Sequence, residues 1–309
     1  MLLTVLAGLL TTMFVVQVMP ASPRRAAAVS PKAAGGHHSP TGGTAGKPHT
    51  GTAVPVPNIP GAFTGAVTRP RVGDGCGLAL RARSSARPVG DCTVVEIGDS
   101  LGNDLGWGLQ RELAPSAGLR LVQLDKSSTG LANSGYYDWQ AQLAAALQSY
   151  HPQLVLISLG GNDEQGLYAH GAAVQFPTAA WQAAYTQRVG DLVREASASG
   201  AYVLWVGLPI MEQPSYSQGI RLLDSIYQKT VTSEPNATFV TTWPLLANRQ
   251  GEFQSQAMVN GQSAALRAPD GIHYSYVGED VLAAYVLREM ALIYHVDLAP
   301  ASEEKITGW

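Results

Sequence analysis

Between residues 93 and 295, short runs of large apolar residues alternate with longer segments that have the length and composition of helices. The clearest run is QLVLISL at Gln153–Leu159, which is apolar at nearly every position, as expected for a strand covered on both faces. Strands that alternate with helices favour a parallel sheet between two helical layers. We therefore expect an α/β protein, a three-layer α/β/α sandwich with a central parallel sheet of the flavodoxin-like kind.

The pattern also places the individual elements. The expected strands are Thr93–Ile97, Arg120–Leu124, Gln153–Leu159, Ala201–Gly207 and Thr238–Thr242. The expected helices are Leu101–Leu113, Tyr137–Tyr150, Thr178–Ser199, Ser217–Ser233 and Val277–Tyr294, and Gly200 is expected to end the third of these.

The chain before residue 76 has a different composition. Leu2–Met19 is an apolar run without charge, near the lower length limit for a membrane-spanning helix and long for the core of a signal peptide. Ala21–Gly75 is rich in proline, glycine, alanine and threonine and has almost no large apolar residue to offset the entropy of ordering. We expect a signal peptide or membrane anchor at 1–21, a disordered linker at 22–75 and one folded domain at 76–309.

Charge bears on location and partners. The net charge of −3 is too small to indicate a nucleic-acid partner, but residues 1–75 are basic and the remainder is acidic. This asymmetry suits a tether near an anionic membrane or cell wall, with incidental linker charge as the alternative. Arg24 and Arg25 follow the apolar run and on their own would keep the body in the cytoplasm. We nonetheless expect export, with a start upstream of Met1, so that the protein is periplasmic, membrane-anchored or secreted.

The chain contains two cysteines, Cys76 and Cys92, at the start of the expected domain. An even count at short spacing in an exported protein favours one disulfide, and two unpaired thiols are the alternative. Closing a loop of this size would contribute about 3 kcal/mol in the chain-entropy model. Neither cysteine belongs to a zinc-binding pattern.

Four short polar blocks follow expected strands or precede the last helix. They are GDSL at 98–101, STG at 128–130, GGND at 160–163 and DGIH at 270–273. Each alone is typical of an ordinary turn. In an open parallel sheet, however, the loops at the carboxyl ends of the strands form the binding site. The blocks together therefore predict one site at that edge.

The residue types in these blocks suit acyl transfer. A serine hydroxyl is a poor nucleophile without a neighbouring base, and Ser100 follows the first strand. Among the histidines, His273 alone has an acid, Asp270, three residues away in a loop at this edge, and His170 is the only rival. Asp270 would fix the imidazole tautomer and stabilise its charged form. The backbone amides of Ser100 and Gly130 and the side chain of Asn162 would stabilise an oxyanion.

The four blocks resemble those of the SGNH hydrolase family, also called GDSL esterases, over roughly residues 93–295. The residues that name the family match Ser100, Gly130, Asn162 and His273. The resemblance implies a triad of Ser100, His273 and Asp270. It also implies an oxyanion hole formed by Ser100, Gly130 and Asn162. The segment TGLANSGYYDW at 129–139 further resembles a bacterial subgroup of exported members, which implies a cell-envelope setting.

Other classes of protein explain the blocks less well. The pattern GDSLG at 98–102 also fits the nucleophile elbow of α/β-hydrolases, but that turn needs several strands before it and here follows the first. A flavodoxin-like cofactor-binding protein would need a Ser/Thr-rich phosphate loop in place of GDSLGNDLGWG. No zinc, phosphate-loop or dinucleotide motif is present, so we expect neither metal nor cofactor. A catalytically silent polysaccharide-binding module of the same fold stays an alternative.

The expected substrate follows from export and from the resemblance. We expect a serine esterase that acts on acyl esters, above all O-acetyl esters, of an envelope or extracellular polysaccharide. An acetyl transferase to a glycan and a lipase or thioesterase stay open, and oligomeric state is not indicated. Candidate substrate-binding residues lie beside Gly130 and in the loops after the third and fourth strands: Tyr137, Asp138, Tyr168 and Tyr216.

Overall fold

The computed structural model describes residues 92–113 and 118–294. Within them, five parallel strands form one sheet in the order β2-β1-β3-β6-β7. The strands are β1 (Cys92–Gly98), β2 (Leu119–Asp125), β3 (Leu154–Ser158), β6 (Tyr202–Val206) and β7 (Ala237–Val240). The predicted central parallel sheet is confirmed. The expected signal segment and linker lie outside the described residues.

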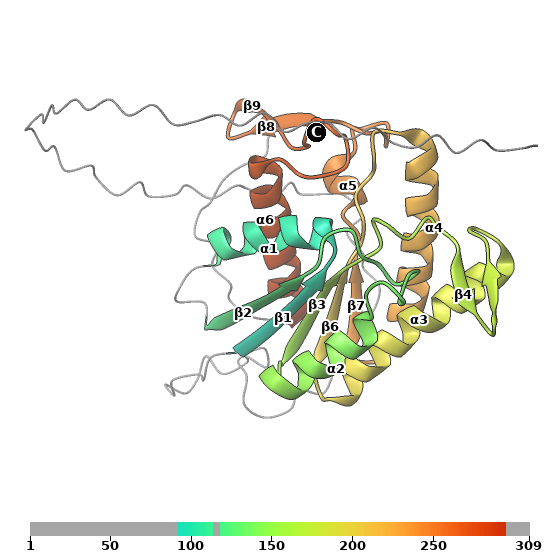
Figure 1. The fold of residues 1–309 in the computed structure, drawn as a ribbon. Coiled ribbons are helices and arrows are strands. Elements are labelled where there is room, and N and C mark those ends of the chain that lie inside the picture. Colours follow the sequence, from blue (N-terminus) through green and yellow to red (C-terminus); the bar gives the residue numbers. More distant parts are fainter. Residues whose placement is uncertain (1–91, 114–117, 295–309) are drawn as a thin grey trace, which may run out of the picture. The chain divides into compact units, whose positions relative to one another are not determined.

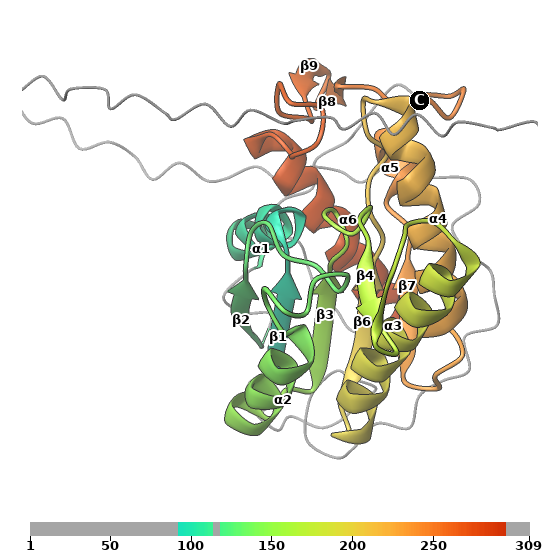
Figure 2. The same cartoon turned by 45° about the vertical axis from the view of Figure 1, so that its right-hand side comes forward.

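Helices cover both faces of the sheet, which completes the predicted three layers. They are α1 (Ser100–Glu112), α2 (Trp139–Tyr150), α3 (Ala179–Ala198), α4 (Pro214–Val231) and α6 (Tyr276–Tyr294). Helices α1 and α6 pack together on one face, and α2, α3 and α4 lie on the other (Figures 1 and 2). All residues of β1, β3 and β6 are buried, as expected for strands covered on both faces.

The strand order fixes where a site can form. The chain runs from β1 outward to β2 and then crosses back to β3 on the other side of β1. This reversal separates the loops that follow β1 and β3 and opens a crevice at the carboxyl ends of the strands. The strands end level with one another, because Gly98 pairs with both Asp125 and Ser158. Ser100 and Asn162 therefore emerge on the two sides of the same crevice.

Sequence patterns missed three small elements, all outside the main sheet. Two are antiparallel hairpins, β4 (Leu167–Ala169) with β5 (Ala172–Val174), and β8 (Gln256–Val259) with β9 (Gln262–Ala265). The third is the single turn α5 (Trp243–Leu246). The strands of the two hairpins are three or four residues long and mostly exposed, so they lack the apolar alternation that identifies a strand.

Several helix boundaries also differ from the expected ones. The fourth long helix begins at Pro214 rather than Ser217, because proline at the first helical position has no N–H to leave unpaired. The third begins one residue late, since Thr178 is its N-cap and accepts from the N–H of Trp181. Gly200 follows the end of that helix with a φ of 89°, a conformation that favours glycine.

Two expectations about the start of the chain stay predictions. Cys92 is buried in β1, but Cys76 lies outside the described residues, so the disulfide is not tested. The expected signal peptide or membrane anchor at 1–21 also lies outside the described residues. Across residues 92–113 and 118–294, no helix combines the length and apolar character needed to span a membrane.

Candidate active site

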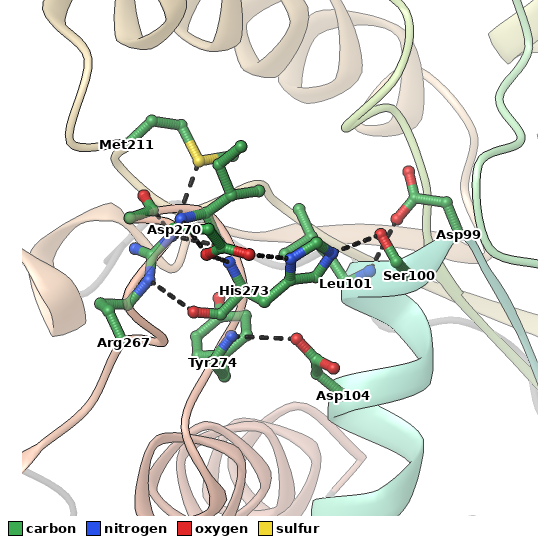
Figure 3. Close-up of polar contacts among 11 residues, drawn as sticks. Asp99, Ser100, Leu101, Asp104, Met211, Arg267, Asp270, His273 and Tyr274 are labelled. Carbon is green, nitrogen blue, oxygen red and sulfur yellow. Dashed lines mark hydrogen bonds and ion pairs between the residues drawn. The ribbon is translucent and has the colours of Figure 1, made fainter. Parts of the chain in front are cut away.

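Three polar side chains meet in a chain of hydrogen bonds at the carboxyl edge of the sheet. Ser100 is the first residue of α1, directly after β1, and His273 and Asp270 lie in the loop before α6. The His273 Nε2 atom lies 2.8 Å from the Ser100 Oγ atom, and His273 Nδ1 lies 2.7 Å from Asp270 Oδ2 (Figure 3). These distances suit a base that accepts the serine proton and an acid that orients the base.

The Asp270 carboxylate is held in its charged form. Partial burial raises the pKa of this carboxyl, but the hydrogen bonds from the His273 ring and from the N–H groups of Ile272 and His273 lower it to about 2. Asp270 therefore carries a full negative charge at neutral pH. A charged carboxylate on Nδ1 keeps the proton on that nitrogen and leaves Nε2 free to face the serine.

The loop that carries His273 is anchored to α1 and to a buried arginine. Asp104 in α1 accepts a hydrogen bond of 3.0 Å from the backbone N–H of Tyr274. The guanidinium of Arg267, 3% exposed, donates to the backbone carbonyls of Ile210, Gly271, Ile272 and His273 (Figure 3). Burial lowers the pKa of this guanidinium, yet an arginine remains charged in proteins. These contacts fix the imidazole relative to the serine.

Asp99 fixes the other side of the crevice. Its carboxylate is fully buried and accepts from the N–H groups of Leu101, Gly160 and Gly161, at 2.8–2.9 Å. Burial raises the pKa of Asp99 to about 6, against the lowering effect of these three donors. One side chain therefore caps α1 beneath Ser100 and holds the loop after β3, which carries Asn162.

Gly130 lies in a loop that a second buried carboxylate holds in place. Asp163 accepts from the N–H groups of Leu131 and Ala132, each at 2.8 Å, and from the Tyr185 hydroxyl at 2.6 Å. A Cβ atom on Gly130 would lie 2.1 Å from Asp163 Oδ1, so no larger residue fits without displacing this carboxylate. Asp163, the residue that follows Asn162, therefore sets the position of Gly130.

Asn162 is tied to the same loop. Its Nδ2 atom donates to the Thr129 carbonyl at 2.9 Å. The side-chain amide has two N–H groups, so a second donor is left for a ligand. Ser100 begins a helix, and its backbone N–H has no partner within that helix. The positive end of the α1 dipole adds to these donors where negative charge would develop.

Two carboxyls, the buried Glu96 and the half-buried Asp125, lie beneath the serine turn, and sequence patterns gave no sign of them. A Cβ atom on Gly102 would lie 3.0 Å from Glu96 Oε1 and 3.1 Å from Asp125 Oδ1, so both side chains converge under the first turn of α1. Glu96 is fully buried. Burial, and next the Asp125 carboxylate, raise the pKa of Glu96 well above its usual value, which favours the protonated form of this carboxyl.

This pair predicts a pH-dependent stability. Because the folded state raises the pKa of Glu96, its stabilising effect is present below the unfolded value of 4.5 and is lost as the pH rises towards the raised pKa. We expect the melting temperature of Glu96→Gln to fall less than that of the wild type between about pH 5.5 and about pH 8.5. The control is Glu234→Gln, in the loop before β7. Equal falls in all three proteins would show that Glu96 does not carry this dependence.

The predicted substrate-binding residues lie in three different places. Tyr137 and Asp138 line a cavity of about 490 Å³ that also borders Gly130. Tyr216, half-buried in α4, donates its hydroxyl to the Gly161 carbonyl beside Asn162. Tyr168 lies in the β4–β5 hairpin, is 66% exposed and donates to the Gly171 carbonyl at 2.8 Å, and it does not line the cavity. His170, the rival base, is an exposed residue in the turn of that hairpin.

The fold and the site together define an α/β/α protein with a serine, a histidine and an aspartate hydrogen-bonded in series at the sheet edge. The chain belongs to the family described as "Protein of unknown function (DUF459)", whose model matches residues 93–289. Among curated proteins, a sequence comparison finds no match.

Solved structures similar to this chain include those of TesA, EstA and Axe2. TesA is 24% identical, with 65% of this chain and 99% of that chain covered and a TM-score of 0.46. The psychrotrophic esterase EstA from Pseudoalteromonas sp. is 18% identical, with 65% and 98% covered and a TM-score of 0.43. Axe2, an acetylxylan esterase from Geobacillus stearothermophilus, is 18% identical, with 65% and 94% covered and a TM-score of 0.48.

Proposed function

We propose that the protein is a serine esterase of the SGNH type, with Ser100 as nucleophile, His273 as general base and Asp270 as the residue that orients the base. The observation that carries the proposal is the 2.8 Å contact between Ser100 Oγ and His273 Nε2, continued by the 2.7 Å contact to Asp270. A positioned base is what turns a serine hydroxyl into a nucleophile.

The reaction proceeds in two halves. Ser100 Oγ attacks the ester carbonyl while His273 Nε2 takes the hydroxyl proton, and a tetrahedral intermediate forms. Its oxyanion accepts hydrogen bonds from the N–H groups of Ser100 and Gly130 and from the Asn162 side chain. The intermediate collapses, and the leaving alcohol takes the proton from His273. Water then attacks the acyl-enzyme by the same steps and releases the acid.

The proposed substrate is an acyl ester, above all an O-acetyl ester, of an envelope or extracellular polysaccharide. The cavity beside Gly130 combines aromatic residues with charged and amide side chains, which suits a sugar more than a fatty acyl chain. Axe2, one of the similar structures, is named as an acetylxylan esterase. Export of the protein, with the basic segment before residue 76 near anionic polymers, belongs to the same proposal.

The ester preference tests the substrate class. We expect kcat/KM for p-nitrophenyl acetate to exceed that for esters of eight to sixteen carbons by roughly tenfold or more, because charged and amide side chains share the lining of the cavity beside Gly130 with its apolar residues. The measurement compares this series with acetate release from acetylated glycans, and Ser100→Ala gives the background. Highest kcat/KM on long chains, with no acetate released from any glycan, would refute the glycan esterase and favour a lipase or thioesterase.

A further inference from the structure

The cavity beside Gly130 lies where the loop after β2 meets α2 and α3, on the face of the sheet that these helices cover. In Figures 1 and 2, α2 and α3 lie side by side there. Gly130 borders the cavity and also supplies one of the proposed oxyanion donors. Gly130 is therefore the residue that the cavity lining shares with the proposed oxyanion hole, whereas Ser100, Asn162 and His273 do not line the cavity.

We propose that this cavity is a subsite for a neutral sugar residue of the acylated glycan, with Tyr137, Arg188 and Arg194 among its binding residues. The inference rests on the proposed function and adds a binding site to it. Three features of the lining carry it: a fixed aromatic ring, guanidinium donors, and a balance of opposite charges.

The aromatic ring is held by its neighbours. Tyr137 and Trp139 meet edge to face, with ring centroids 4.9 Å apart. Trp139 is buried in turn, and its Nε1 atom donates to Thr129 Oγ1 at 3.0 Å, in the loop just before Gly130. Tyr137 is only half-buried, so part of its ring is open to the cavity. A rigid, partly open ring is a surface on which the apolar face of a sugar can stack.

The guanidinium of Arg188 has N–H donors that the hydrogen bonds within the protein do not use. Arg188, in α3, donates to the backbone carbonyls of Leu131, Ala132 and Tyr168, at 2.5–2.9 Å. A guanidinium has five N–H donors, so these bonds fix the group without using all of them. No carboxylate in residues 92–113 and 118–294 forms an ion pair with Arg188. The bonds also join the cavity wall to the two residues that follow Gly130.

The charges of the lining indicate a neutral ligand. Arg194 pairs with Asp191 three residues earlier on α3, and Asp138 lies across the cavity at the N-cap of α2. Two arginines and two aspartates thus line one cavity, so an anionic polymer gains no net attraction. Vicinal sugar hydroxyls accept from guanidinium N–H groups and donate to carboxylates. The mixture therefore matches a polyol ring.

Arg194→Ala tests the subsite, since this side chain is 54% exposed and holds no part of the proposed oxyanion loop. The readout is the ratio of kcat/KM for the best acetylated neutral oligosaccharide to kcat/KM for p-nitrophenyl acetate. The oligosaccharide panel contains acetylated xylo-, gluco-, manno- and chito-oligomers. We expect the ratio to fall by roughly tenfold. The matched control is Arg120→Ala, which removes an exposed arginine near the amino end of β2 and is expected to keep the wild-type ratio.

An unchanged ratio in Arg194→Ala, or an equal fall in Arg120→Ala, would overturn the subsite. A second measurement tests the subsite independently of esterase activity. Calorimetry measures binding of the same oligomers, without acetyl groups, to full-length Ser100→Ala with and without Arg194→Ala. Binding that Arg194→Ala weakens roughly tenfold supports the subsite even if no ester is cleaved. Turnover of p-nitrophenyl acetate with no binding of any oligomer overturns the subsite and leaves the esterase standing.

Discussion

Replacing Ser100 by alanine is expected to reduce ester hydrolysis by a factor on the order of 10⁴–10⁶. The variant keeps the oxyanion donors but has no oxygen to attack the ester, so only the direct attack of water remains. The fold is expected to persist, because Ser100 is only half-buried and its Oγ atom bonds to His273, a residue of the surface loop before α6. The measurement is the steady-state rate on p-nitrophenyl acetate, with circular dichroism and melting temperature as checks on folding.

Ser225→Ala serves as the comparison for this loss. Ser225 is an exposed hydroxyl on α4, away from the proposed site. A purified Ser100→Ala protein that turns over ester at the wild-type rate would mean that another group attacks the carbonyl. A loss of folding in Ser100→Ala would instead require the comparison to be repeated with Ser100→Gly.

Replacing Asn162 by alanine is expected to lower kcat by roughly 10²–10³, the usual effect of losing one oxyanion donor. The loss should appear in kcat more than in KM, because the donor acts on charge that develops only in the transition state. The same side chain also holds the Thr129 carbonyl, so Asn162→Asp is a useful second variant. It keeps the size of the side chain, removes the N–H donors and adds a negative charge beside the oxyanion.

We expect Asn162→Asp to be at least as impaired as Asn162→Ala, since a carboxylate repels the developing charge. A loss below about threefold in Asn162→Ala would mean that the amide points away from the reacting carbonyl. An active Asn162→Asp would mean that the oxyanion lies elsewhere.

Much of the fold could be predicted from the sequence because the central strands are buried on both faces. A run such as QLVLISL predicts a buried strand even when its neighbouring strands are unknown. The alternation of such runs with helices then implies a parallel sheet. The carboxyl edge follows from that topology, so the loops with Ser100, Asn162 and His273 could be placed together. Short, exposed hairpins such as β4–β5 have no such signal.

The support of the site could not be predicted in the same way. Asp99 and Asp163 have turn-like neighbours in the sequence, and their furthest backbone N–H partners lie 62 and 32 residues away, respectively. Arg267 is a charged residue whose burial no local pattern indicates. The cavity is formed by a loop and two helices, so its lining has no continuous motif. Such features depend on tertiary contacts rather than on local periodicity.

A serine-reactive phosphonate probe tests the central claim most directly, because it bonds only to a hydroxyl that a base has activated. The full chain is incubated with the probe, digested, and the modified peptide is located by mass spectrometry. We predict one phosphonate per chain, on Ser100, with labelling abolished in Ser100→Ala and strongly slowed in His273→Ala. Wild-type protein that stays unlabelled, or labelling that persists at another residue in Ser100→Ala, would contradict the assignment of Ser100 as the activated nucleophile.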